Sequence, residues 1–179
     1  MRKIGCLVLL AAGIMLAALY ATKPSFATPA NAGFKATTLA TGTFAEFEVF
    51  NQISRQDLPP AFEGNVWLSM QKTKGPSDLY VQSNVWQPGG STGWHTHPGH
   101  SLIIITSGTV TQYGHDCIPR VYGPGTELGT TLIDAGGDHV HLIRNEGSIP
   151  ATGVAVQLVA QGATRRIDAP APSGCESVL

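Results

Sequence analysis

The sequence predicts an all-β protein with a single domain, and three observations point to this fold class. Only 13% of the 179 residues are charged and 21 are glycine, a composition that suits turn-rich β-structure better than charged helices. Short apolar segments alternate with a period of two, as half-buried strands do. Beyond the first 27 residues, no stretch sustains an amphipathic period of 3.6 residues over three turns, and no internal repeat is visible.

The chain begins with the parts of a signal peptide. Arg2 and Lys3 precede an apolar run over residues 4–19, and Ser25-Phe26-Ala27 supplies the small-x-small pattern that signal peptidase recognises. A permanent N-terminal anchor is the alternative, although the run is short for a membrane span of about 20 residues. We expect cleavage after Ala27, secretion or an extracytoplasmic location such as the periplasm or cell envelope, and no stable membrane insertion of the mature chain.

The mature chain is expected to be acidic and to keep two cysteines. Cleavage removes three of the 11 basic residues and none of the 12 acidic ones, so nucleic acid is not an expected partner. Cys117 and Cys175 remain, and two cysteines outside the cytoplasm are more often bridged than free. The sequence therefore predicts a disulfide between them, with two buried thiols as the alternative.

The strands are expected as short segments separated by turns. Residues 42–50 alternate as a first strand, and residues 51–64 contain Pro59-Pro60 and should mostly cross between strands, with weak pairing over 65–71. Residues 79–86 alternate again and end at the turn Pro88-Gly89-Gly90. Six further strands are expected at residues 94–97, 101–106, 109–113, 130–134, 139–145 and 154–160. Eight or more short strands are typical of a sandwich or a barrel.

These segments divide the chain into four expected parts. The signal peptide occupies residues 1–27, and N-terminal strands with a connecting segment occupy residues 28–78. A β-barrel is expected over residues 79–163. The proline-rich tail, residues 164–179, should be extended and irregular, and Cys175 would tie it down.

Four of the six histidines form two pairs, His95-Thr96-His97 and His139-Val140-His141. Residues i and i+2 of a strand project from the same face, so each pair can direct two imidazoles into one space. Imidazole suits zinc, copper, iron and nickel. If that face is the barrel interior, the histidines form a metal site; a single pair on a β-face would more often be exposed or merely hydrogen-bonded.

The surroundings of the first pair resemble the cupin family over roughly residues 79–160. The first cupin motif places a glycine, a His-x-His pair, a glutamate and a second glycine at fixed spacings. Gly89, His95, His97 and Gly108 match those spacings, and Ser101 stands at the glutamate position. The resemblance implies a single cupin-type β-barrel, a double-stranded β-helix or jelly roll. It also implies His95 and His97 as ligands of a divalent metal ion.

The second cupin motif fits in two registers. His141 has the family's spacing to Asn145, whereas His139 fits the upstream half of the motif, in which Asp134 replaces a proline. We favour His141. Because the two alternatives differ by one strand period, both could face the same way, and a site of four histidines, with His139 as the fourth, stays open.

The resemblance leaves the function open between three hypotheses. The first is a metal-dependent oxygenase or oxidase acting on a small organic substrate, because some cupins without the glutamate are three-histidine iron dioxygenases. The second is a non-catalytic module that binds a small ligand or the metal itself, and the third is a structural cupin with an empty site. The sequence does not specify the metal, which could be Fe, Mn, Zn, Ni or Cu. A homodimer is compatible with the sequence.

The replacement of the glutamate shapes the expected chemistry. A ring of neutral imidazoles leaves the full charge of the ion, so the metal should be a stronger Lewis acid and favour an anionic or enolizable ligand. Trp86 and Trp94 flank the first motif and, with Ser101, are candidates for the pocket wall, although aromatic residues on strands are more often core. His100 and His115 are expected outside the cluster.

Overall fold

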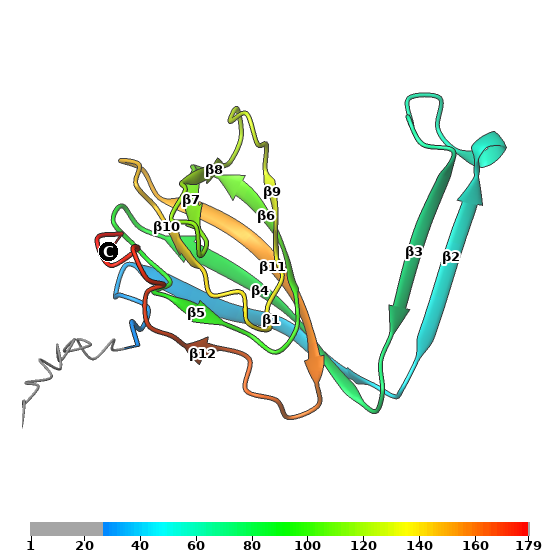
Figure 1. Cartoon of the computed structure of the whole chain (residues 1–179), viewed down its shortest axis with the longest axis horizontal. Coiled ribbons are helices and arrows are strands. Elements are labelled where there is room, and N and C mark those ends of the chain that lie inside the picture. The colour runs from blue at the N-terminus through cyan, green and yellow to red at the C-terminus, as the bar shows by residue number, and fades with distance from the viewer. Residues whose placement is uncertain (1–26, 179) are drawn as a thin grey trace, which may run out of the picture.

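The computed structural model describes residues 27–178, and within this range it confirms the all-β prediction (Figure 1). The strands β1 to β12 are accompanied there by one 3-10 helix, η1, Arg55–Asp57. The predicted signal sequence up to Phe26 lies outside the described residues. Within 27–178, no helical segment has the length and apolar composition of a membrane-spanning helix.

The larger sheet contains five antiparallel strands in the order β1-β4-β11-β6-β9. They are β1 Phe34–Phe44, β4 Ser77–Trp86, β11 Ala151–Ala160, β6 Ser101–Ser107 and β9 Thr131–Asp134. The side chains of β11 alternate strictly between buried and half-buried up to Val159. This is the period-two pattern of a strand with one face toward a core. The sheet includes β1, which precedes the range 79–163 expected for the barrel.

A second layer faces this sheet and closes the barrel. It combines β10 Leu142–Arg144, β7 Val110–Tyr113 and β8 Arg120–Tyr122 with the short pair β12 Ile167–Asp168 and β5 His95–Thr96. Two isolated bridges connect the chain around β5 with the chain around β10: Ser91 with Arg144, and His95 with His141. The two layers of antiparallel strands agree with the predicted cupin-type barrel. β8 and β12 were not predicted from the sequence.

The hydrophobic core lies between the two layers. One cluster consists of buried residues from both layers: Trp86, Ile103, Ile105, Val110, Leu132, Ile143, Ala151 and Ala155. A second cluster contains Trp94, Tyr113, Leu142 and Cys175 and lies beside the C-terminal tail. Four residues of the first cluster, Trp86, Ile103, Ile143 and Ala155, also line the cavity of the site described below.

The predicted disulfide is confirmed. Cys117 and Cys175 are bonded, with their α-carbons 5.4 Å apart. The tail is irregular, as expected, but it is held at two places, because β12 pairs with β5 and Cys175 is fully buried in the second cluster. The tail is therefore part of the barrel wall.

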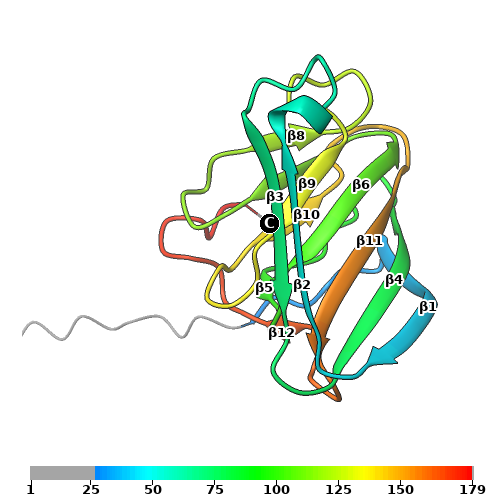
Figure 2. The same cartoon turned by 90° about the vertical axis from the view of Figure 1, so that its right-hand side faces the viewer.

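Strands β2, Glu48–Ser54, and β3, Val66–Lys72, form a separate two-stranded hairpin (Figures 1 and 2). We call these two strands, together with the turn that joins them, the arm. The sequence predicted one strand over 42–50, but the chain bends at residues 45–47. The Phe47 amide donates to the hydroxyl of Thr73, and the Thr73 amide donates back to the carbonyl of Phe47. The weak pairing expected over 65–71 is instead a ladder of seven residue pairs.

Candidate metal centre

Three histidines and one aspartate converge inside the barrel. The side chains of His95, His97, His141 and Asp134 offer ligand atoms that all lie within 4.8 Å of one another. Each of the four residues is at most 7% exposed. The structure thus brings together three of the histidines singled out from the sequence. It adds a carboxylate that the sequence analysis had not assigned as a ligand.

Backbone pairing aligns the two cupin-like motifs. The amides of His95 and His141 each donate to the carbonyl of the other, at 2.9 and 3.0 Å. Gly136 brings the second loop against the first, with a φ of 72°. A Cβ at this glycine would lie 2.6 Å from the carbonyl oxygen of His97 and 2.5 Å from that of Gly99, so only glycine permits this approach.

Each histidine is oriented by a backbone carbonyl close to it in the chain. Nδ1 of His95 lies 3.0 Å from the carbonyl of Gly93, that of His97 2.9 Å from the carbonyl of Gly99, and that of His141 3.0 Å from the carbonyl of His139. Because a carbonyl oxygen only accepts, each Nδ1 must carry the proton. A neutral imidazole then has its lone pair on Nε2, which is the tautomer that a metal ligand needs.

The Nε2 atoms face one another and the carboxylate. His97 Nε2 is 2.8 Å and His141 Nε2 is 2.5 Å from Asp134 Oδ2, and the Nε2 atoms of His95 and His141 are 3.2 Å apart. With both Nδ1 atoms protonated, two neutral rings would direct lone pairs at each other across this distance. A cation or a shared proton between them removes that repulsion. The residues therefore fit a metal ion.

The electrostatics of the cluster also suit a cation. Burial, helped by His141 and Arg166, lowers the pKa of His95 to about 2, so this ring is neutral. Burial opposes the charge on His97, but the hydrogen bond and the charge of Asp134 outweigh it and raise the His97 pKa. Burial opposes ionisation of Asp134 as well, yet its hydrogen bonds to His141 and His97 prevail and lower its pKa. A buried anion thus lies among three imidazoles.

Asp134 compensates for the carboxylate that Ser101 does not supply. Ser101 and Asp134 are direct partners across β6 and β9, so their side chains project from the same face of the sheet. The expectation that the metal would face imidazoles alone is therefore corrected, because Asp134 brings one negative charge from the adjacent strand. The sequence did contain an indication of this role. Asp134 lies two residues after the buried Leu132 on the same strand, so both side chains point to the same, inner face.

His139 is not part of the cluster. Its residue is exposed, and only its carbonyl contributes, as the acceptor for His141 Nδ1. The expectation that His139 and His141 share a face required a regular strand. The chain instead turns here, and the His139 amide donates to the carbonyl of Gly136. His100 and His115 are also exposed and lie apart from the cluster, as expected.

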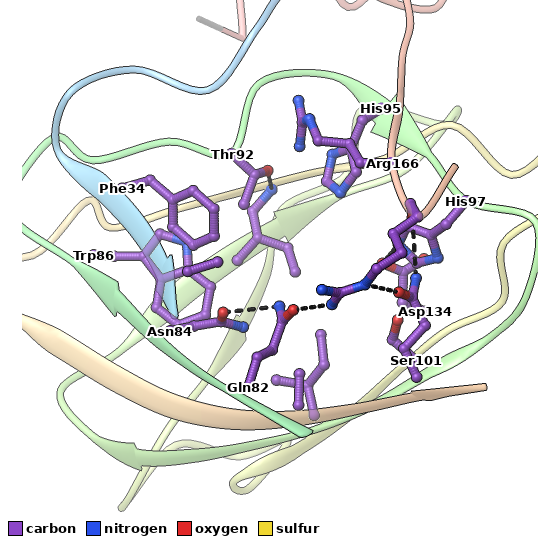
Figure 3. Close-up of a pocket in the computed structure, with 16 residues that line it drawn as sticks. Phe34, Gln82, Asn84, Trp86, Thr92, His95, His97, Ser101, Asp134 and Arg166 are labelled. Carbon is purple, nitrogen blue, oxygen red and sulfur yellow. Dashed lines mark hydrogen bonds and ion pairs between the residues drawn. The ribbon is translucent and has the colours of Figure 1, made fainter. Parts of the chain in front are cut away.

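A cavity of about 220 Å³ adjoins the cluster (Figure 3). Figure 3 shows His97, Asp134 and Ser101 on one side of this cavity and the rings of Phe34 and Trp86 on the opposite side. The polar residues of the wall are Gln82, Asn84, Thr92, Gln157, Arg165 and Arg166. The cavity therefore offers an apolar wall, amide groups and two cations next to the candidate metal site.

The structure separates the two tryptophans that the sequence grouped together. Trp86 lines the cavity and packs against Phe34, with ring centroids 5.2 Å apart. Trp94 is fully buried in the second core cluster and is not among the residues of the cavity wall. Asn145, which the motif spacing picked out, is also fully buried and donates to the carbonyls of Trp86 and Ile149. It holds the loops of the barrel together.

Comparisons with known proteins add solved structures alone, since no protein-family model and no curated protein matches the chain. A DMSP lyase from Ruegeria pomeroyi aligns with 54% of this chain and 45% of its own at 21% identity and a TM-score of 0.43. A polyketide cyclase from Streptomyces resistomycificus aligns with 55% of this chain and 66% of its own, at 15% identity and a TM-score of 0.43. A cupin domain from Bordetella pertussis aligns with 46% of this chain and 82% of its own, at 20% identity and a TM-score of 0.38. At these scores the likenesses carry no argument about activity.

Proposed function

We propose that this β-barrel of the cupin type is an exported metalloenzyme, an oxygenase or oxidase that acts on a small organic anion. Its residues His95, His97, His141 and Asp134 would hold one divalent metal ion. The observation that carries the proposal is the orientation of the three imidazoles. Their Nδ1 protons are fixed on carbonyls, so the Nε2 atoms, once they have lost their protons to an incoming ion, direct their lone pairs to one buried point beside a carboxylate. A bound iron or copper ion would supply the redox chemistry that side chains lack.

The cavity residues support an anionic substrate. Arg166 is close enough to the cluster for its charge to oppose protonation of both His95 and His97, although the net effect of all causes on the His97 pKa is to raise it. Its Nη2 is buried with no hydrogen-bond partner among residues 27–178. Its Nε donates to Asp168 at 2.6 Å, so the side chain is held in place. A carboxylate or enolate in the cavity would meet this charge. Phe34 and Trp86 would contact the apolar part of the same molecule.

Arg165 has a different role from its neighbour. Its guanidinium donates to Gln157, Thr38 and Gln82, and it stacks on the ring of Tyr80 with a distance of 3.9 Å to the centroid. All of its nitrogens thus have partners in the wall. Arg165 fixes the amide groups that face the substrate, while Arg166 provides the attraction for an anion.

A non-catalytic binding module is favoured by one specific observation, the number of protein ligands. Four ligands complete the tetrahedral shell of zinc, and such closed sites are structural. A six-coordinate ion would keep two positions open for substrate and dioxygen beside the cavity. The identity of the metal therefore separates the two functions.

Export is supported by the signal-like N-terminal sequence and by the disulfide, because disulfides persist in oxidising compartments. We propose cleavage after Ala27, which leaves a mature chain beginning at Thr28. N-terminal sequencing of secreted material tests this cleavage. An intact Met1 on membrane-bound protein would contradict it.

The test of the catalytic proposal begins with elemental analysis of the mature chain as purified. Iron or copper near one ion per chain is expected, and stoichiometric zinc in a protein that consumes no oxygen would favour the binding module. The chain loaded with Fe(II) should then consume oxygen with enolizable diketones or phenolic acids. Asp134→Asn should abolish both metal binding and uptake, whereas Asp138→Asn, in an exposed carboxylate of the adjacent loop, should change neither. Uptake that survives His95→Ala would overturn the proposal.

A further inference from the structure

The arm exposes an apolar face that no described part of the chain covers. Its register places Phe50 opposite Met70, Gln52 opposite Leu68 and Ser54 opposite Val66, so these side chains share one face. Phe50 is 59%, Met70 70%, Leu68 57% and Val66 46% exposed. The opposite face also carries apolar side chains, but these are fewer and on the whole less exposed: Val49 46%, Trp67 41% and Ile53 38%. A single two-stranded hairpin is marginally stable in water. An apolar face of this kind marks an interaction site.

The outer face of the large sheet carries a second apolar surface. Direct register partners form an uninterrupted row across all five strands: Ala40, Val81, Val156, Leu102 and Ile133. Leu102 is 48% and Ile133 69% exposed, and Ile104, two residues from Leu102 on β6, is 52% exposed. The opposite face of the same strands already forms the core. The row is therefore available to another surface.

The arm is held away from the sheet of its own chain. Figures 1 and 2 agree that it leaves the corner where β1 ends and β4 begins and lies on the outer side of the large sheet, spread apart from it. Reciprocal hydrogen bonds between Phe47 and Thr73 continue the pairing of β2 and β3 to the base of the arm, where the Gly75 amide also donates to the Glu46 carboxylate at 2.7 Å. The arm is therefore paired along its whole length.

We propose that the occupant of both surfaces is a second copy of this chain. In a twofold dimer, each arm packs its Phe50–Met70 face against the outer face of the large sheet of the other copy. Such an isologous arrangement buries two arms and two sheets at once. An arm about 23 Å long and about 10 Å wide has a face of about 230 Å², so two arms against two sheets bury about 900 Å², close to the lower limit for a specific interface.

The distribution of charge favours a protein partner over a lipid surface. The apolar face of the arm is bounded at its base by the pair Glu48 and Lys72. The tip carries Arg55, Asp57 and Glu63. A charge-poor centre with a charged rim is typical of protein interfaces. The charged tip would have to enter the bilayer first if the arm inserted into a membrane.

The experiment is sedimentation of the mature wild-type chain and of three variants at tens of micromolar. The wild type should be a dimer, and Phe50→Asp on the arm or Leu102→Asp on the sheet should each weaken association at least tenfold. Asn51→Asp is the matched control, because it adds the same charge to the opposite face of the same strand and should leave the dimer intact. Unchanged metal content in all variants shows that the barrel still folds.

Mixing the two weakened variants tests the pairing of arm with sheet directly. Phe50→Asp keeps an intact sheet and Leu102→Asp keeps an intact arm, so the mixture can form one complete contact and should associate at least tenfold more tightly than either variant alone. A monomeric wild type would overturn the proposal, as would a dimer that tolerates Phe50→Asp. A monomer that floats with lipid vesicles and loses this on Phe50→Asp would identify a membrane surface instead.

Discussion

The candidate metal centre and the arm distribute polar and apolar side chains in opposite ways. In the centre, four ionisable residues are at most 7% exposed, and each finds hydrogen-bond or ionic partners among the others and nearby carbonyls. On the arm, Phe50 and Met70 are 59% and 70% exposed and have none of the packing that such side chains obtain in a core. Burial of a charge is costly unless it is paired, and exposure of apolar surface forgoes burial energy. Both departures from the usual pattern mark places where the molecule meets something else.

The largest expected effect concerns the disulfide on the barrel side of this comparison. Replacing Cys117 and Cys175 by serine opens a link between residues 58 positions apart and should lower the free energy of unfolding by about 4 kcal/mol in the chain-entropy model. Denaturant unfolding of the barrel measures this loss. Labelling of two free thiols in the wild type without reductant would contradict the bridge.

Truncation of apolar side chains should then distinguish the two regions. Ile103→Ala removes a side chain that is 5% exposed in the core and should cost about 2 to 5 kcal/mol. Met70→Ala on the arm should cost less than about 0.5 kcal/mol at protein concentrations that keep the chain monomeric. Urea unfolding of both variants checks the contrast. Equal costs would show that the arm is packed in solution.

Removal of a ligand tests the metal centre itself. His95→Ala, His97→Ala and His141→Ala should each lower metal affinity at least tenfold, because each removes one of four ligands and leaves the remaining buried groups. His139→Ala should have no effect, since its side chain is exposed and its carbonyl remains. Titration with a competing chelator measures the affinities. A loss on His139→Ala alone would mean that the second motif has the other register.

A further expected effect is the pH dependence of metal affinity. The pKa of His97 is raised, so without metal this ring keeps its proton to a pH above its ordinary value of about 6.5, and the ion must displace it. Affinity should therefore fall about tenfold for each pH unit below the raised pKa. His95, with a pKa of about 2, stays neutral and adds nothing above pH 4. Binding unchanged down to pH 4 would exclude histidine ligation.

The sequence predicted the parts of the structure that depend on local spacing. Motif spacing identified His95 and His97, strand alternation identified the core of β4, and the turn residues between short segments identified β6 and β9. Alternation could not choose between His139 and His141, because it applies to regular strands and the chain turns there.

Apart from the disulfide, two features that depend on contacts between distant residues were not predicted. Asp134 joins the site through its cross-strand pairing with Ser101, 33 positions away. The base of the arm is closed by Phe47 and Thr73, which are 26 positions apart. The phase of Asp134 with Leu132 indicates an inward-facing acid but does not show which residues it meets, and the pairing of Phe47 with Thr73 leaves no periodic signal. Local patterns thus predicted the strands, while the fourth ligand and the arm required the assembled fold.

The carbonyl anchors of the three histidines give the site an independence from its surroundings. Many metal sites orient their imidazoles through neighbouring side chains, so changes in the wall disturb the ligands. Here the anchors are main-chain atoms of Gly93, Gly99 and His139, each two positions from the histidine it holds. Mutations in the cavity wall can therefore alter which molecule fits without reorienting the ligands. This separation makes the barrel a suitable scaffold for the evolution or engineering of new substrate ranges around a constant metal centre.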